Sequence, residues 1–280
     1  MKVISKLVVK VRASLDSDFQ RAVFDGAINC LGNENDPLRV NTFATALREL
    51  VRLILRDRAP DSQIKNSDWY KPEYNENGKE VITRSQRVRY AIQAGLPTEF
   101  VQQSLGVDVT QTIKELNSLN SQFSKYTHIE EDTFNVSSSE AEQFAEDALE
   151  TFVLFYETID ECKVSVQSAL ETYARREIEE ELVHNVTHEL DQLATHYWVD
   201  QVNLNDVTLE FMDSEHVTIA VGGTVDCVHQ YGSDSDFDRG DGVRTSGNYP
   251  FAARYRADIT NPCDLRPLGS LSVDNSSFYE

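Results

Sequence analysis

The stretch HVTIAVGGTVDCVHQY, residues 216–231, is rich in residues that favour β-strands. VTLEFM (207–212) precedes it, FAARYRADI (251–259) follows it, and turn-forming residues separate the three runs. Short β-rich runs with turns between them predict an antiparallel sheet. The period of the apolar pattern changes from about 3.6 to 2 near residue 200, so the sheet is expected to begin there.

The chain before residue 200 carries apolar residues at helical spacing instead. In PLRVNTFATALRELVRLILRDRA, proline near the first turn favours a helix start, and Ala59-Pro60 favours its end. Thr83 is an expected N-cap, and Gly95 an expected helix end. The helices predicted in this way are residues 37–59, 83–95, 108–126, one that begins near Ser139, and one near 165–197. The polar, aromatic segment 61–78 is predicted to be a long ordered loop.

These patterns predict an α+β protein with two domains. The first, residues 1–200, is mainly helical, and the second, residues 201–280, is a small antiparallel β domain. The four cysteines are scattered without a CxxC pair, which favours a reducing, cytoplasmic location. No apolar run approaches the roughly 20 residues that span a bilayer, so no membrane contact is expected.

The formal charge of -21 is unevenly distributed. Residues 1–128 hold 18 Lys/Arg against 15 Asp/Glu, a net of +3; residues 129–200 hold 3 against 19, or -16; residues 201–280 hold 5 against 13, or -8. A nucleic acid would be repelled by the second and third parts, so any contact is expected in the N-terminal half. The simpler alternative is that the charge serves solubility alone.

Arg84, Arg87 and Arg89 form the densest basic cluster of this acidic chain. On a helix, Arg84 and Arg87 share a face while Arg89 points elsewhere. The cluster is therefore the candidate for contact with nucleic-acid phosphates. The alternative is that it pairs with the acidic second half of the same chain.

The segment ELNSLNSQFSKYTHIEED places five polar or basic residues near a helix end: Asn117, Asn120, Lys125, Tyr126 and His128. This arrangement resembles HEPN-type helical proteins, many of which are RNases. The resemblance implies that His128 does acid–base work on a ribose 2′-hydroxyl. The usual HEPN pattern has an arginine four to six residues before the histidine, and here Lys125 is the nearest cation. The alternative is that His128 caps or packs the helix end.

The line GTVDCVHQYGSDSDFDRGDG, followed by NYPF at 248–251, carries a second resemblance. It is similar to the C-terminal part of bacterial predicted pPIWI-associating nucleases. The matching positions are Gly232, Ser233, Ser235, Asp236, Arg239, Gly240, Asp241 and Gly242. Further similar stretches, among them TRSQRVRYAIQAGL and LATHYWVD, extend the resemblance over most of the chain.

The resemblance implies a nuclease that acts in prokaryotic anti-phage or anti-plasmid defence, with a protein partner from the same defence cassette. Asp236 and Asp241 would hold a divalent metal such as Mg²⁺, and Arg239 would contact the scissile phosphate. The equally simple alternative is that Arg239 pairs with one of these carboxylates and fixes the shape of the loop. At the level of the whole protein, the alternative is a non-enzymatic sensor or adaptor of the cassette.

Calcium and zinc are less well supported by the sequence. Counted from Asp234, an EF-hand loop would need glycine at Arg239 and glutamate at Thr245. His184 and His188 have the i, i+4 spacing of zinc ligands, but no third and fourth ligand accompany them. We therefore expect neither site, and the identity of any metal stays open.

Overall fold

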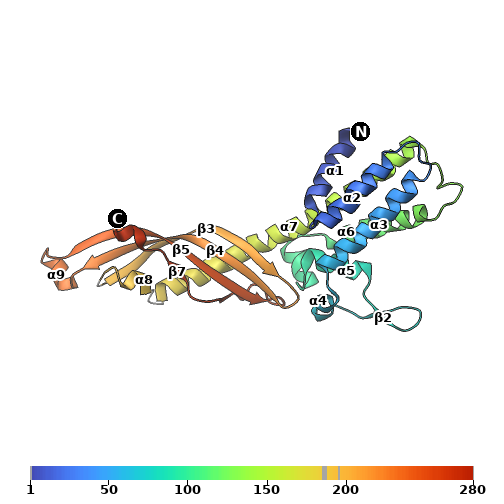
Figure 1. The fold of residues 1–280 in the computed structure, drawn as a ribbon. Coiled ribbons are helices and arrows are strands. Elements are labelled where there is room, and N and C mark those ends of the chain that lie inside the picture. The colour runs from blue at the N-terminus through green and yellow to red at the C-terminus, as the bar shows by residue number, and fades with distance from the viewer. Residues whose placement is uncertain (1, 185–187, 195, 280) are drawn as a thin grey trace. The chain divides into compact units, whose positions relative to one another are not determined.

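A computed structural model describes residues 2–184, 188–194 and 196–279, without the side chains of residues 2, 3, 183, 184, 188, 189 and 237. The imidazoles of His184 and His188 thus lie outside the described part. The chain forms two compact units, Met1–Cys162 and Lys163–Glu280. The fold is α+β as predicted, with helices first and an antiparallel sheet after them (Figure 1).

The first unit is helical. Its elements are α1 (Lys2–Ser14), α2 (Asp18–Leu31), α3 (Arg39–Arg58), α4 (Asp61–Asn66), α5 (Arg84–Gln93), the π-helix η1 (Phe100–Ser104), α6 (Val109–Thr127) and the first half of α7 (Ser138–His184). Phe144 of α7 lies at the centre of the core. Its ring meets Phe43 of α3 and Phe123 of α6 edge-on, at centroid distances of 5.9 and 5.8 Å. Such aromatic pairs join the three helices.

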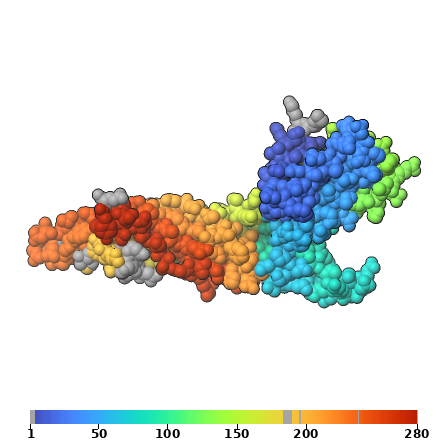
Figure 2. Space-filling model, viewed as in Figure 1, coloured from blue at the N-terminus to red at the C-terminus, as the bar shows by residue number. Residues whose placement is uncertain are grey.

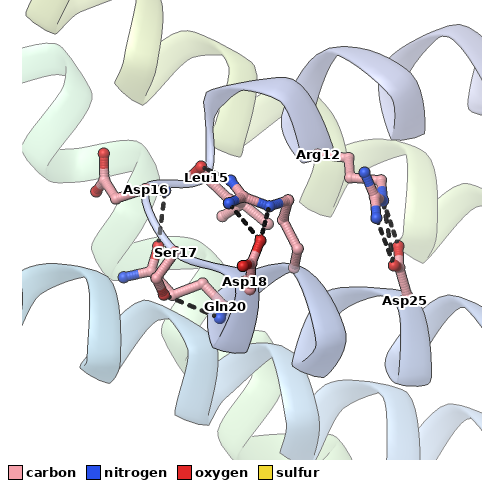
Figure 3. Close-up of polar contacts among 8 residues, drawn as sticks. Arg12, Leu15, Asp16, Ser17, Asp18, Gln20 and Asp25 are labelled. Carbon is pink, nitrogen blue, oxygen red and sulfur yellow. Dashed lines mark hydrogen bonds and ion pairs between the residues drawn. The ribbon is translucent and has the colours of Figure 1, made fainter.

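The turn between α1 and α2 is fixed by polar contacts (Figure 3). Ser17 is the N-cap of α2, and its hydroxyl accepts from the Gln20 backbone N–H at 3.1 Å. The Arg12 guanidinium makes a two-pronged pair with Asp25, with Nε 2.9 Å from Oδ1 and Nη2 3.0 Å from Oδ2. The Ser17 bond uses a donor that the start of α2 would otherwise leave unpaired, and the Arg12–Asp25 pair joins α1 to α2.

The segment predicted as a long loop contains two short elements. Helix α4 opens it, and a hairpin of β1 (Glu73–Tyr74) and β2 (Glu80–Val81) follows. Gly78 takes a φ of 69° at the turn, a conformation that glycine adopts without strain. This hairpin projects from the surface of the first unit as the cyan extension in Figure 2.

Helix α7 is one continuous helix where the sequence predicted two. The 47 residues from Ser138 to His184 contain neither glycine nor proline, so nothing in the backbone interrupts the hydrogen-bond ladder. The predicted helix to Tyr197 was wrong at its end. A short helix α8 (His188–Asp191) follows, and strand β3 (His196–Met212) already includes Tyr197.

The second unit combines the C-terminal half of α7, from Lys163, with a five-stranded antiparallel sheet. Its strands are β3, β4 (His216–Tyr231), β5 (Val243–Asp258), β6 (Arg266–Pro267) and β7 (Ser272–Val273). The order is β3-β4-β5-β6, and β7 also pairs with β5. A five-residue helix, α9 (Asp234–Asp238), lies at the tip of the β4–β5 hairpin (Figure 1). The chain ends in a 3₁₀ turn, η2 (Ser276–Tyr279).

One face of this sheet packs against α7. The helix contributes a row of buried residues four apart: Val166, Leu170, Ala174, Ile178 and Leu182. The inward residues of β5 are buried at alternate positions, as a half-covered strand requires. Tyr255 connects the two layers directly, because its hydroxyl donates to Glu181 Oε2 at 3.0 Å. Each fully buried aliphatic side chain of this kind contributes about 1.5–3 kcal/mol.

Candidate nucleic-acid interface

Helix α5 presents the predicted arginines because its start is fixed. Thr83 caps the helix as predicted, and its hydroxyl accepts from the Gln86 backbone N–H. The Gln86 side chain closes the capping box by accepting from the Thr83 N–H at 2.9 Å. The amide of Gln86 also donates to Lys71 O at 2.7 Å, which ties the cap to the preceding loop. Arg84 and Arg87 follow directly from this fixed point.

A groove of about 420 Å³ runs between α3 and α5. The lining residues are Arg48, Glu49, Arg52, Leu55, Arg56, Ile82, Arg84 and Arg87. Arg48, Arg52 and Arg56 are four residues apart on α3, which places them on one helix face. The lining thus contains five arginines and one acidic residue, Glu49, in a chain whose net charge is -21. We call this feature the arginine groove.

Three of the five arginines are neutralised by neighbours. Arg52 Nε lies 2.7 Å from Glu49, Arg56 Nη2 lies 3.2 Å from Asp57, and Arg87 Nη2 lies 2.7 Å from Asp61. Arg87 also donates to the Ala59 carbonyl at 2.9 Å. These contacts hold the side chains in place while leaving further guanidinium N–H groups for a ligand.

Arg48 and Arg84 have no carboxylate partner among the described residues. Arg48 reaches only the Thr127 hydroxyl, at 3.4 Å. Arg84 is half-buried, and this burial, followed by the like charge of Arg48, lowers the pKa of its guanidinium. Two neighbouring guanidinium groups without an acidic partner repel each other, and a bound anion reduces this repulsion. A phosphate is an anion that a guanidinium binds through two parallel hydrogen bonds.

Arg89 lies apart from the groove, as the helix spacing predicted. Its Nη1 donates to the Thr98 hydroxyl at 3.0 Å, and its guanidinium stacks on the Trp69 ring with 5.7 Å to the centroid. Burial lowers the pKa of Arg89 as well. Its contacts within the fold give it a packing role. The structure therefore brings Arg84 and Arg87 together and separates them from the third predicted residue.

His128 is the exposed C-cap residue of α6. Its carbonyl accepts from the Thr133 hydroxyl at 2.7 Å, which fixes the backbone where the helix ends. Its chain neighbour Thr127 is the residue that accepts from Arg48. The end of α6 thus contacts one lining residue of the arginine groove, Arg48, although His128 does not itself line the groove.

The predicted Asp236, Arg239 and Asp241 belong to the second unit, at the tip of the β4–β5 hairpin. Ser233 and Asp236 form a capping box around α9. The Ser233 N–H and hydroxyl donate to Asp236 Oδ2 at 2.9 and 2.7 Å, and the Asp236 N–H donates to the Ser233 hydroxyl at 3.2 Å. Arg239 Nη2 pairs with the other carboxylate oxygen, Oδ1. The Asp241 N–H donates to Asp236 O at 2.9 Å.

These contacts give a structural meaning to much of the motif. Gly232 and Gly240 take φ values of 95° and 83°, which only glycine adopts readily. The hydrogen bonds from Ser233, and then the one from Arg239, lower the pKa of Asp236. Both oxygens of this carboxylate already accept hydrogen bonds, so a metal ion bound there would compete with Arg239 and Ser233. In the described part of the chain, no three His, Cys, Asp or Glu side chains gather as a metal site requires.

Comparison with known families identifies the chain. A model described as "Predicted pPIWI-associating nuclease" matches residues 12–152, and a second model with the same description matches residues 159–279. The chain belongs to this family of predicted nucleases. The two matched regions meet close to the division of the structure at Cys162. No curated protein and no solved structure matches the chain.

The sequence reasoning missed two groups of residues. It used only the apolar face of α3, although the spacing of Arg48, Arg52 and Arg56 was visible in RELVRLILR. It also passed over His229 and Tyr249, which lie inside the motif that carried the family resemblance. They are distant in sequence, but the antiparallel register of β4 and β5 brings His229 Nε2 to 2.9 Å from the Tyr249 hydroxyl.

Proposed function

We propose that the protein is a nuclease that holds a nucleic-acid strand in the arginine groove of its first unit. The observation that carries the proposal is that Arg48 and Arg84 line one groove and have no carboxylate partner among the described residues, in a chain of net charge -21. Phosphate contacts of this type position a strand without reading its sequence. Membership in a family of predicted nucleases also supports a nucleic acid as the substrate.

His128, which follows the Arg48 partner Thr127 in the chain, is the candidate acid–base group. An unprotonated imidazole would take the proton of a ribose 2′-hydroxyl, whose oxygen then attacks the adjacent phosphorus. The bond from phosphorus to the 5′-oxygen breaks, and the leaving oxygen takes a proton from an acid or from water. The groove guanidiniums would stabilise the extra negative charge on the phosphoryl oxygens during this step. The role of His128 stays a prediction.

The test is a binding series with single-stranded RNA, single-stranded DNA and duplex DNA, each about twenty nucleotides long, at several KCl concentrations. The logarithm of affinity should fall linearly with the logarithm of salt concentration, by about 0.7 per phosphate contact for a single strand. Arg84→Ala should weaken binding to all sequences alike and reduce that slope by about one contact.

Arg12→Ala is the matched control, because it removes an exposed arginine of the same unit that is paired with Asp25. Equal losses in the two variants would show that binding follows overall charge and would refute the groove. Cleavage is followed on the same substrates with Mg²⁺, Mn²⁺ or EDTA. His128→Ala should abolish metal-independent RNA cleavage and leave binding unchanged.

We further propose that this activity serves anti-phage or anti-plasmid defence together with a protein of the same cassette. The alternative is a non-enzymatic sensor that uses the groove only to bind. The hydrogen bonds that Asp236 accepts from Ser233 and Arg239 favour this alternative, because a metal ion would have to compete with them. The non-enzymatic sensor would be supported if the groove binds nucleic acid but no substrate is cleaved with Mg²⁺, Mn²⁺ or EDTA.

A further inference from the structure

The N-terminal half of β5 is a free sheet edge. β7 pairs with Phe251 and Ala252, and β6 pairs with Tyr255 and Arg256. Residues 243–249 of β5 pair only with β4 among the described strands. Their register with β4 is regular, whereas β3 at the opposite edge contains three irregularities. Bulges protect an edge from further pairing, so the two edges differ in their readiness to accept another strand.

The outward backbone groups of this free edge follow from the register. Pro250 O accepts from Asp274 N at 2.8 Å, and Arg254 O accepts from Leu268 N at 2.7 Å, so even-numbered residues of β5 point away from β4. By the alternation of an antiparallel strand, Ser246 and Asn248 direct their N–H and C=O groups to the free edge. Proline at position 250 fits the same alternation, because its missing N–H costs no bond to β4.

A pocket of about 390 Å³ lies beside this edge, next to η2. The lining residues are His229, Tyr231, Thr245, Ser246, Gly247, Asn248, Tyr249, Ser277 and Phe278. His229 is fully buried, and its Nδ1 has no hydrogen-bond partner among the described residues. Gly247 is required beside it, because a Cβ there would lie 2.2 Å from the Tyr249 hydroxyl. The pocket therefore has aromatic walls, and an unpaired imidazole nitrogen is buried next to it.

Net charge distinguishes the possible occupants. Lys163–Glu280 contains 8 Lys/Arg and 21 Asp/Glu, a net of -13. A nucleic-acid strand would be repelled by the unit as a whole, and so would a second copy, although residues 243–249 themselves contain one cation, Arg244, and no acid. A basic polypeptide would be attracted. The outward N–H and C=O groups of the β5 edge favour an extended peptide in particular, because a peptide strand can form a hydrogen bond with each of them.

We propose that the free edge of β5, residues 243–249, binds an extended basic segment of a partner protein as an additional strand. One side chain of that segment enters the pocket. An aromatic side chain fits best, because the rings of Tyr249 and Phe278 line the pocket. This inference is independent of nucleic-acid binding by the first unit.

The probe is a fluorescein-labelled nonapeptide of alternating lysine and valine around a central tyrosine, measured by anisotropy with the full chain. Ser246→Pro removes one outward N–H and blocks the approach of a strand, so it should weaken binding by at least about tenfold. Ser246→Ala is the matched control and should bind as the wild type does. Thermal unfolding of both variants checks that the sheet is intact.

Two further peptides separate strand addition from general attraction to an acidic protein. A peptide N-methylated at alternate residues keeps its charge but loses the N–H groups of one edge, and it should bind at least about tenfold more weakly. Replacing the central tyrosine by valine should weaken binding to the wild type, and Phe278→Ala should reduce that difference.

Several outcomes would overturn the proposal. One is failure of the tyrosine peptide to bind the wild type, and another is equal binding of the N-methylated and unmodified peptides. Equal binding by Ser246→Pro and Ser246→Ala, with both folded, would also do so. Sedimentation equilibrium that shows a dimer dissolved by Ser246→Pro would assign the edge to a second copy of the chain instead.

Discussion

Helices α5 and α9 both begin with a capping box, but they differ in whether the arginines near the box are paired with an acid. Each helix starts with a capping box, Thr83 with Gln86 in α5 and Ser233 with Asp236 in α9. In α9 the acidic residue of the box pairs with Arg239. In α5 the corresponding residue is a neutral glutamine whose amide is already bound to the Lys71 carbonyl.

The comparison shows that a local motif does not decide whether an arginine is available to a ligand. The acids that surround each arginine do: Asp236 lies one turn before Arg239 and pairs with it, whereas Arg48 and Arg84 have no carboxylate partner among the described residues. The α9 loop uses its charges internally and is fixed by them. The arginine groove keeps the charges of Arg48 and Arg84 unneutralised, which is the condition for binding an anion.

The largest expected effect follows from reversing those two charges. Arg48→Glu combined with Arg84→Glu removes two phosphate contacts and adds two repulsions, so affinity for a single strand should fall by about a hundredfold or more. The double variant Arg239→Glu and Arg266→Glu changes net charge equally, and both of its arginines are already paired. A comparable loss of affinity in this control would show that the arginine groove and the α9 loop do not differ in their contribution to binding.

An intermediate effect is expected from the two caps. Thr83→Ala removes the hydroxyl that accepts at the start of α5 and should lower the free energy of unfolding by about 1 kcal/mol, while Thr83→Ser retains it. Ser233→Ala should disrupt only α9, because a five-residue exposed helix has little core to release. Urea titrations compare the three variants. Equal destabilisation by Thr83→Ala and Ser233→Ala would show that both caps support the global fold.

The fold was largely predictable because its signals are local. Helical spacing, the Thr83 cap and the change of period before β4 each depend on neighbouring residues. The missed continuity of α7 has a different origin. From Lys163 onward its buried row faces the sheet of the second unit, whereas its earlier residues face other helices. A change of partner alters the apolar pattern, and in sequence it was indistinguishable from a helix end.

The candidate sites were less predictable because they depend on pairing across elements. Proximity in sequence identified Arg84 and Arg87 but could not exclude Arg89, whose partners Trp69 and Thr98 come from other segments. Arg48 became a candidate only when α3 was placed beside α5. His229 and Tyr249 required the register of two strands. Each of these relations is a tertiary contact, which no local period encodes.

The smallest expected effect tests whether the α9 loop is fixed by its charges. The pKa of Asp236 is lowered, so its contribution to stability is fully present above the ordinary value of 3.8 and is lost as pH falls through the lowered value. Asp236→Asn should therefore reduce the urea midpoint at neutral pH, and the difference from wild type should shrink below about pH 4. Asp238→Asn, an exposed neighbour outside the capping box, is the control.

Arg239→Ala should have a weaker effect than Asp236→Asn, because the Ser233 hydrogen bonds remain and the ion pair is mostly exposed. Metal-dependent cleavage measured on the same Arg239→Ala protein distinguishes the alternative. Its complete loss at an unchanged melting temperature would mean that Arg239 acts on substrate and that the loop belongs to a catalytic site.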